Sequence, residues 1–275
     1  MIRLMFLEFG KLARRPRSYL GYLGVLLLIG PTMLALHQGN PERMFRNQAG
    51  SGFEIIGSFC NALFLARTLM EPAMAVFIPL FVSLIAGDMV SGEEAEGTLR
   101  VLLVRPVSRR AVLSAKYAVA LLHAATIPLF LLLAALSLGG IFFGYGDMLT
   151  PGDGIVVYPQ NEALARLFGA SLTGALGMGT IAAVAFLLSV LTRNSNGAII
   201  GAMMLLIISG TVGQIPYFER IQPYLFTTHL GAWRLFFEQA IPWKEIAQAA
   251  AWHLSYITLC FLAALSIFQR KDILS

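Results

Sequence analysis

The 275-residue sequence is 57% hydrophobic and only 13% charged, and it carries a formal net charge of +5. Soluble domains devote about a quarter of their residues to charged side chains, so this composition excludes an ordinary soluble protein and indicates an integral membrane protein. A nucleic-acid partner would require basic residues interleaved with aromatic ones on a soluble face. The sequence lacks that pattern, so we interpret the net charge as a sign of membrane topology.

Residues 1–16 predict an amphipathic helix that lies in the headgroup layer. Apolar side chains recur at helical spacing, and basic side chains lie off that stripe. We expect the helix to stop before Pro16, because proline removes a backbone donor. The alternative is a simple positively charged anchor. The stripe consists of Ile2, Met5, Phe6, Phe9, Leu12 and Ala13, and the basic residues beside it are Arg3, Lys11 and Arg14.

Six stretches are apolar and long enough to span a bilayer, which takes roughly 20 residues each. They predict an all-α membrane protein that forms a single transmembrane domain over residues 1–275. An even number of spans places both termini on one side, and that side collects 13 of the 20 Lys and Arg residues. The positive-inside rule therefore predicts cytoplasmic termini. The stretches are 19–36, 70–87, 116–143, 166–191, 197–215 and 246–268.

The charged stretch at 87–110, GDMVSGEEAEGTLRVLLVRPVSRR, predicts a helix of about a dozen residues over 91–104. We expect Ser91 and Glu94 to form a capping box at its start, and Pro106 to end the element. Ser108 is expected to cap the third span, where Arg109 and Arg110 oppose the helix dipole. Their position suggests contact with anionic headgroups or with an acidic partner. The predicted apolar face consists of Ala95, Leu99, Leu102 and Leu103. This element is either a docking surface or a solvated helix at the bilayer surface.

The remaining segments predict loops and close packing. The loops at 37–61 and 144–165 are rich in Gly, Asn, Pro and Asp, which predicts turns and irregular structure. The aromatic segment 216–245 predicts one or two short amphipathic helices at the external interface. Proline is expected to kink the second and third spans. Small residues at Gly174, Gly177, Gly197 and Gly201 predict close helix packing, either within one bundle or between two copies. The prolines concerned are Pro72, Pro79 and Pro128.

Catalytic and metal sites find no support in the sequence. No H-E-x-x-H or G-x-x-x-x-G-K-[ST] pattern occurs, so we predict no catalytic residue, no metal ligand and no nucleotide site in this chain. His123 and His253 fall inside predicted spans at different depths, where a hydrogen bond between helices is the favoured role over a direct function. Cys60 and Cys260 are interpreted as small buried residues that do not meet.

The run GDMVSGEEAEGTLRVLLVRPVSRRAVLSAK and the closing FQRKDILS resemble the ABC type-2 permease family, the membrane subunits of a class of ATP-binding-cassette exporters. Together with the six-span layout, the resemblance covers essentially the whole chain. It implies that 1–16 is the connecting helix, 91–104 the coupling helix and 216–245 the external re-entrant segment. The coupling role is thereby assigned to Glu93, Glu94, Gly97, Thr98, Leu99, Leu102, Leu103, Pro106, Arg109 and Lys116.

The same resemblance implies the partners and the location. Two permease chains, identical or different, would assemble with two copies of a separate ATPase subunit that binds ATP and Mg in the cytoplasmic membrane of a prokaryote. The expected cargo is an amphipathic or lipid-like small molecule or a peptide, moved by alternating access. Two alternatives remain open: a membrane module for maturation of a metalloenzyme, such as a copper enzyme, or of surface machinery, and a membrane scaffold unrelated to ABC proteins.

Overall fold

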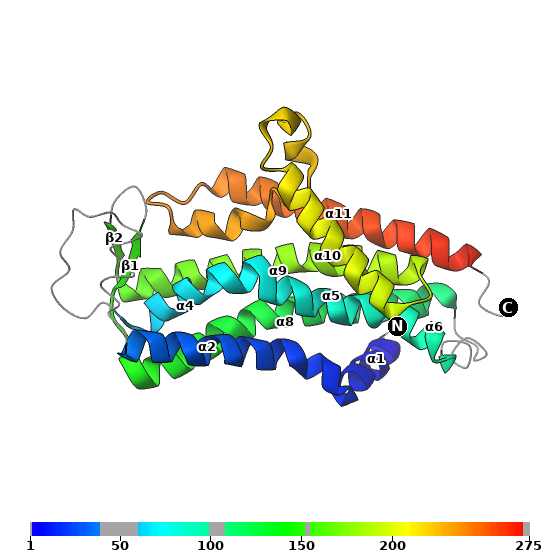
Figure 1. Ribbon diagram of the computed structural model, residues 1–275, viewed down its shortest axis with the longest axis horizontal. Helices are drawn as coiled ribbons and strands as arrows, with labels where there is room; N and C mark the ends of the chain where they lie inside the picture. Colours follow the sequence, from blue (N-terminus) through cyan, green and yellow to red (C-terminus); the bar gives the residue numbers. More distant parts are fainter. Residues whose placement is uncertain (1, 39–59, 99–107, 152–154, 272–275) are drawn as a thin grey trace.

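The computed structural model describes residues 2–38, 60–98, 108–151 and 155–271. Its long helices lie side by side in an elongated bundle, and the two chain ends lie at the same end of it (Figure 1). The described elements, in chain order, are α1 (Ile2–Arg14), η1 (Pro16–Tyr19), α2 (Leu20–Gln38), α4 (Ala62–Pro72), η2 (Ala73–Phe77), α5 (Ile78–Asp88), α6 (Ser91–Ala95), α8 (Arg109–Phe143), β1 (Met148–Pro151), β2 (Ile155–Tyr158), α9 (Gln160–Leu191), α10 (Ser195–Val212), η3 (Pro216–Phe218), η4 (Gln222–Tyr224), η5 (Leu230–Phe237) and α11 (Trp243–Arg270).

Six helical stretches are long and apolar enough to cross a membrane, which confirms the predicted all-α membrane class. They run Pro16–Gln38, Ala62–Asp88, Arg109–Phe143, Gln160–Leu191, Ser195–Val212 and Trp243–Arg270. Several of these helices begin a few residues before the predicted apolar stretch, because a polar residue caps the helix further upstream. The second span, for example, starts at Ala62, where the Asn61 side chain accepts hydrogen bonds from the amides of Leu63 and Phe64.

Helix α9 is the centre of the bundle. In the most apolar 18-residue stretch of α9, 72% of the residues are buried. The corresponding stretches of α10 and α11 are only 11% and 17% buried. Helix α9 packs against α8, α11, α5, α10 and η5, whereas the outer helices keep apolar side chains exposed, as lipid-facing helices do. The core of this protein therefore forms where the second, third and fourth spans meet.

Two of the predicted packing glycines lie in α9 and serve contacts within the chain. A Cβ at Gly174 would come within 2.8 Å of Met74 Cε in η2. A Cβ at Gly177 would lie 3.2 Å from Leu230 and 3.7 Å from the ring of His253. These small residues therefore let η2, η5 and α11 approach the central helix.

The other two glycines make looser contacts in α10. A Cβ at Gly201 would lie 3.3 Å from Leu188, and one at Gly197 would lie 3.9 Å from Asn194. The tight contact between α5 and α10 instead involves Gly87, where a Cβ would lie 2.9 Å from Ile199. A role for Gly197 and Gly201 between two copies stays a prediction.

The predicted kinks have different outcomes at different prolines. The second span changes at Pro72 from α4 into the π turn η2 and returns to α-helix at Ile78. Such π turns insert a residue into the helix, so they shift the faces of α4 and α5 relative to each other. Helix α8, in contrast, continues through Pro128 as a single 35-residue helix.

The segment after α8 differs from the predicted irregular loop. Strands β1 and β2 pair antiparallel, with Met148 opposite Tyr158, and both of these side chains are buried. The prediction of irregular structure was wrong because it rested on turn residues, whereas the run IVVY favours a strand. Helix α9 then begins at Gln160.

The aromatic segment 216–245 contains three 3₁₀ helices, η3, η4 and η5, and the start of α11. The longest, η5, buries Trp233, Phe236 and Phe237. The predicted short helices are therefore present, in tighter 3₁₀ geometry. Their position outside the membrane stays a prediction.

Candidate functional site

The acidic segment that follows the second span lies at the end of the bundle where both termini lie (Figure 1). It contains Asp88, Glu93, Glu94 and Glu96, and the short helix α6 carries the first two glutamates. Each of these four carboxylates pairs with basic residues from other parts of the chain. We call residues 88–98 the acidic segment.

Four charged side chains meet inside the bundle and form what we call the charge ring: Glu8, Lys11, Glu93 and Lys116. Lys116 Nζ lies 2.7 Å from Glu8 Oε2 and 2.8 Å from Glu93 Oε2. Lys11 Nζ lies 2.8 Å from Glu8 Oε1 and 3.1 Å from Glu93 Oε1. The side chains of Lys116, Glu8 and Glu93 are only 1%, 6% and 6% exposed, whereas that of Lys11 is 43% exposed. The ring therefore joins α1, α6 and α8 at a largely buried site that is open on the side of Lys11.

The ring favours the charged forms of Glu93 and Lys11. Burial alone would raise the pKa of Glu93, but Lys116 and Lys11 outweigh it and hold that pKa below its ordinary value. Burial alone would lower the pKa of Lys11, but hydrogen bonds and attraction from Glu8 and Glu93 raise it. The two buried carboxylates are balanced by one buried cation, Lys116, and one partly exposed cation, Lys11, so neither carboxylate is left unpaired.

These shifts predict the pH dependence of stability. The contribution of Glu93 is complete above its ordinary pKa of 4.5 and is lost as pH falls through the depressed value. The stabilising contribution of Lys11 is complete below its ordinary pKa of 10.5. It is lost as pH rises through the raised pKa of the folded state. We expect the unfolding midpoint of wild type to exceed that of Glu93→Gln at neutral pH, and the gap to narrow below about pH 4.5. Exposed Glu96→Gln is the control; an unchanged gap at acid pH would contradict the assignment.

Asp88 anchors the beginning of the acidic segment. Its Oδ2 accepts from Arg15 Nη1 at 3.0 Å, and its Oδ1 accepts from the Ser195 hydroxyl at 2.6 Å. Arg17 approaches the same carboxylate to 3.9 Å. A Cβ at Gly92 would lie 2.4 Å from Asp88 Oδ1, so only glycine at position 92 leaves room for this arrangement.

Glu94 points to a different set of partners. Its carboxylate pairs with Lys271 Nζ at 2.6 Å and with Arg193 at 3.5 Å. Lys271 also donates to the carbonyl of Val190 at 3.0 Å, and Arg109 donates to the carbonyl of Lys271 at 2.8 Å. The end of α11 is thereby tied to the acidic segment and to the start of α8.

The predicted capping box at Ser91 is wrong, because Ser91 is inside the helix and donates its hydroxyl to the Gly87 carbonyl at 2.8 Å. The cap comes from another helix. The Ser189 hydroxyl on α9 accepts from the amides of Val90 and Ser91 at 3.1 and 2.9 Å. The predicted cap at Ser108 is confirmed, since its hydroxyl accepts from the amide of Ala111.

Helix α6 is shorter than the predicted dozen residues. It ends at Ala95, and Gly97 adopts a φ of +72°, which favours glycine. The Thr98 hydroxyl then donates to the Glu93 carbonyl at 3.2 Å. Within the described part of the segment, Ala95, Glu96 and Thr98 are exposed. The predicted Leu99, Leu102, Leu103 and Pro106 lie outside the described residues.

A second charged cluster lies where α4 meets η5. The Arg67 guanidinium stacks over the rings of Phe237 and Trp233, 4.6 and 5.4 Å from their centroids. Glu71, one turn further along, pairs with Arg67 and with Arg234 of η5. Two cations and one anion thus link the second span to the aromatic segment.

Arg166 fastens the same aromatic segment to α9. It is buried and donates to the carbonyls of Phe236, Glu238 and Gln239 at 2.7, 2.8 and 3.3 Å. Its guanidinium also stacks over the Tyr158 ring at 4.2 Å. These carbonyls end η5, so Arg166 satisfies acceptors that the 3₁₀ helix leaves open.

The two intramembrane histidines make hydrogen bonds between helices, which confirms their favoured interpretation. His123 Nε2 lies 3.3 Å from the Ser18 carbonyl, and His253 Nδ1 lies 2.9 Å from the Thr180 hydroxyl. Both cysteines are free. Among the described residues, no group of three or more His, Cys, Asp or Glu side chains is arranged to hold a metal ion.

The sequence identified one half of the charge pairs and missed the other. Glu93, Glu94, Arg109 and Lys116 were predicted, and the structure brings all four into the network around the acidic segment. Their partners on α1, in the turn between α9 and α10 and at the end of α11 were not. One available signal was Glu8, a lone acid on a basic amphipathic helix, whose charge needs a partner.

The six apolar helices define a multi-pass membrane protein. The chain belongs to the family described as "Protein of unknown function (DUF2705)", which it matches over residues 43–274. It is also similar to the uncharacterized protein YhcI of Bacillus subtilis (strain 168), with 33% identity over 138 residues. That match covers 48% of this chain and 43% of the relative, so less than half of the relative's length is matched.

Proposed function

We propose that this protein is the permease subunit of an ATP-binding-cassette exporter, in which a separate ATPase subunit docks on the acidic segment. The observation that carries this proposal is the number of elements tied to that segment. It continues directly from α5 and pairs with α1, α8, the start of α10 and the end of α11. A push on residues 88–98 is therefore transmitted to the second, third, fifth and sixth spans.

The burial of the glutamates changes how the coupling role is divided. Glu93 and Glu94 face inward and fix the segment to the bundle. The surface left for the ATPase in the described part comprises Ala95, Glu96 and Thr98. The described residues of the acidic segment would thus separate into anchors, which transmit the movement, and an outer face, which receives it.

Transport then follows from movement of the segment. Closure of two ATPase copies on ATP would displace the segment, tilt α5 and α8, and open the path between two permease copies to the other side. The cluster of Arg67, Glu71 and Arg234 would link the second span to the aromatic segment at the far end. The cargo we propose is an amphipathic or lipid-like molecule or a peptide, because the spans are largely apolar.

The test is purification of the tagged chain in a mild detergent from cells that produce it, with identification of bound proteins and an ATPase assay. We expect a nucleotide-binding subunit in roughly equal amount. Ala95→Arg places a bulky cation on the exposed face and should reduce its retention by about tenfold or more, equivalent to about 1.4 kcal/mol.

The control is Asn161→Arg, an exposed position at the opposite end of the bundle, which should retain the subunit. A point substitution is preferable to deleting 91–103, since deletion would also remove Glu93 from the charge ring. Wild-type protein that carries no ATPase would refute the permease proposal and favour a scaffold. Equal retention by Ala95→Arg would place the docking surface elsewhere.

A further inference from the structure

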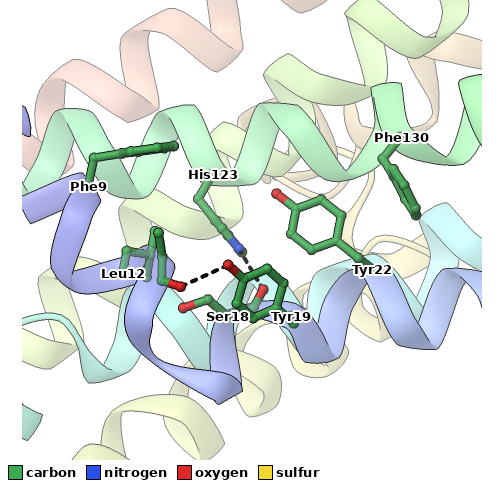
Figure 2. A pocket seen from close by; sticks show the side chains of 8 residues that line it. Phe9, Leu12, Ser18, Tyr19, Tyr22, His123 and Phe130 are labelled. Atoms are coloured by element: carbon green, nitrogen blue, oxygen red, sulfur yellow. Dashed lines mark hydrogen bonds between the residues drawn. The ribbon is translucent and has the colours of Figure 1, made fainter.

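An open groove separates the interfacial helix from the spans beside it. It has a volume of about 400 Å³ and lies between α1, the η1 turn, α2 and α8 (Figure 2). The groove forms because α1 is fixed at two points: the charge ring holds Glu8 and Lys11, and the chain turns through η1 at Pro16. Helix α1 packs against α8 through the ring and buries Leu12, and the groove lies along the side of this contact.

The wall of the groove is aromatic and apolar. Rings of Phe9, Tyr19, Tyr22 and Phe130 line it, and Figure 2 shows these rings placed along its length. Small-molecule sites are typically concave spaces of about 300–1,000 Å³ with mostly apolar walls and a few polar groups. This groove has the size and the lining for a flexible hydrocarbon chain.

One polar group in the wall lacks a partner. The Ser18 hydroxyl is buried, with no hydrogen bond to any of the described residues. Neighbouring polar atoms are already used, since Tyr19 donates to the Ala13 carbonyl at 2.8 Å and Tyr22 bonds Thr126 at 2.7 Å. A buried hydroxyl normally finds a partner, so Ser18 offers a hydrogen bond to a bound polar group.

Two exposed arginines lie next to lining residues in the chain. Arg14 and Arg17 adjoin the lining residues Ala13 and Ser18 in the chain and are exposed. Arg17 is 66% exposed and lies 3.9 Å from Asp88, its nearest acid. Because the first span begins at Pro16, these arginines lie at the depth of lipid headgroups, where cations attract anionic lipids.

From these features we propose that the groove binds one acyl chain of an anionic phospholipid, with its phosphate beside Arg14 and Arg17 and a polar headgroup or glycerol oxygen at Ser18. The site is separate from the proposed transport path, and the inference holds whether or not the chain is a permease. It makes α1 sensitive to the charge of the surrounding lipid.

The test is native mass spectrometry of the delipidated full chain in neutral detergent, titrated separately with palmitoyl-oleoyl phosphatidylglycerol and with palmitoyl-oleoyl phosphatidylcholine. We expect one preferred phosphatidylglycerol per chain, bound about tenfold or more tightly than phosphatidylcholine. Ala13→Trp fills the groove and should weaken that binding by about tenfold. Gly10→Trp adds the same side chain to α1 where a Cβ meets open space, and should bind as wild type does.

The double variant Arg14→Gln, Arg17→Gln should lose the preference for phosphatidylglycerol and keep binding of the hydrocarbon chain. Unchanged binding by Ala13→Trp would overturn the groove as the site, and equal binding of the two lipids by wild type would overturn the anionic ligand. If Ala13→Trp does not fold, Phe130→Trp blocks the other side of the groove and decides the same question.

Discussion

Lys116→Met should be among the most destabilising single substitutions in this protein. It removes the one fully buried cation of the charge ring and leaves Glu8 and Glu93 with only the partly exposed Lys11. Breaking a buried ion pair by removing one partner costs about 3–5 kcal/mol. We expect the thermal unfolding midpoint in detergent to fall by on the order of 10 °C.

The controls for this prediction use the same helix and the same ring. Arg110→Met removes an exposed cation from the first turn of α8 and should change the midpoint little. Adding Glu93→Gln to Lys116→Met removes the stranded carboxylate and leaves the Glu8–Lys11 pair intact, so it should recover much of the loss. A Lys116→Met variant with the unfolding midpoint of wild type would contradict the charge ring. So would a double variant whose midpoint is no higher than that of Lys116→Met alone.

Arg166→Met should release the aromatic segment while leaving the bundle folded. The substitution leaves the buried carbonyl of Phe236 and the partly buried carbonyls of Glu238 and Gln239 without their donor. A buried unsatisfied group costs about 1–3 kcal/mol. We expect hydrogen–deuterium exchange of peptides from 230–242 to speed up by about a hundredfold, which corresponds to roughly 3 kcal/mol of local opening. Exchange in α8 should be unchanged.

Arg220→Met is the matched control, because Arg220 is an exposed arginine of the same aromatic segment. Arg166→Lys should give an intermediate result, since an ammonium cannot present the guanidinium's fixed fork of donors. Wild-type exchange rates in Arg166→Met would show that packing of Trp233 and its neighbours holds the segment without the arginine.

The six spans could be predicted because hydropathy is a local property of the sequence. The second span shows the limit of that signal. Its first turns contain Arg67 and Glu71, which lowered the local hydropathy, although the helix continues through them from the Asn61 cap. The predicted span began at residue 70 and so included Glu71 but missed Arg67, whose contacts with η5 the sequence does not reveal.

The acidic segment shows why the candidate site was only half predictable. Its charges and its motif pointed to a functional surface, but the partners are distant in the chain: Glu93 meets Lys11 from 82 residues away, and Glu94 meets Lys271 from 177 away. Neighbouring glutamates therefore pair with different elements. Periodicity also suggested a cap at Ser91, whereas the cap is Ser189, which only the packing of α9 brings close.

The charge ring also sets an order for assembly during synthesis. Glu8 and Lys11 leave the ribosome first and can neutralise each other on one helical turn, so α1 can wait at the membrane surface. Glu93 emerges next with no buried cation beside it, and Lys116 closes the ring only after the third span has begun. A nascent chain that stops before residue 116 should therefore leave α1 undocked, exposed to quality-control proteases.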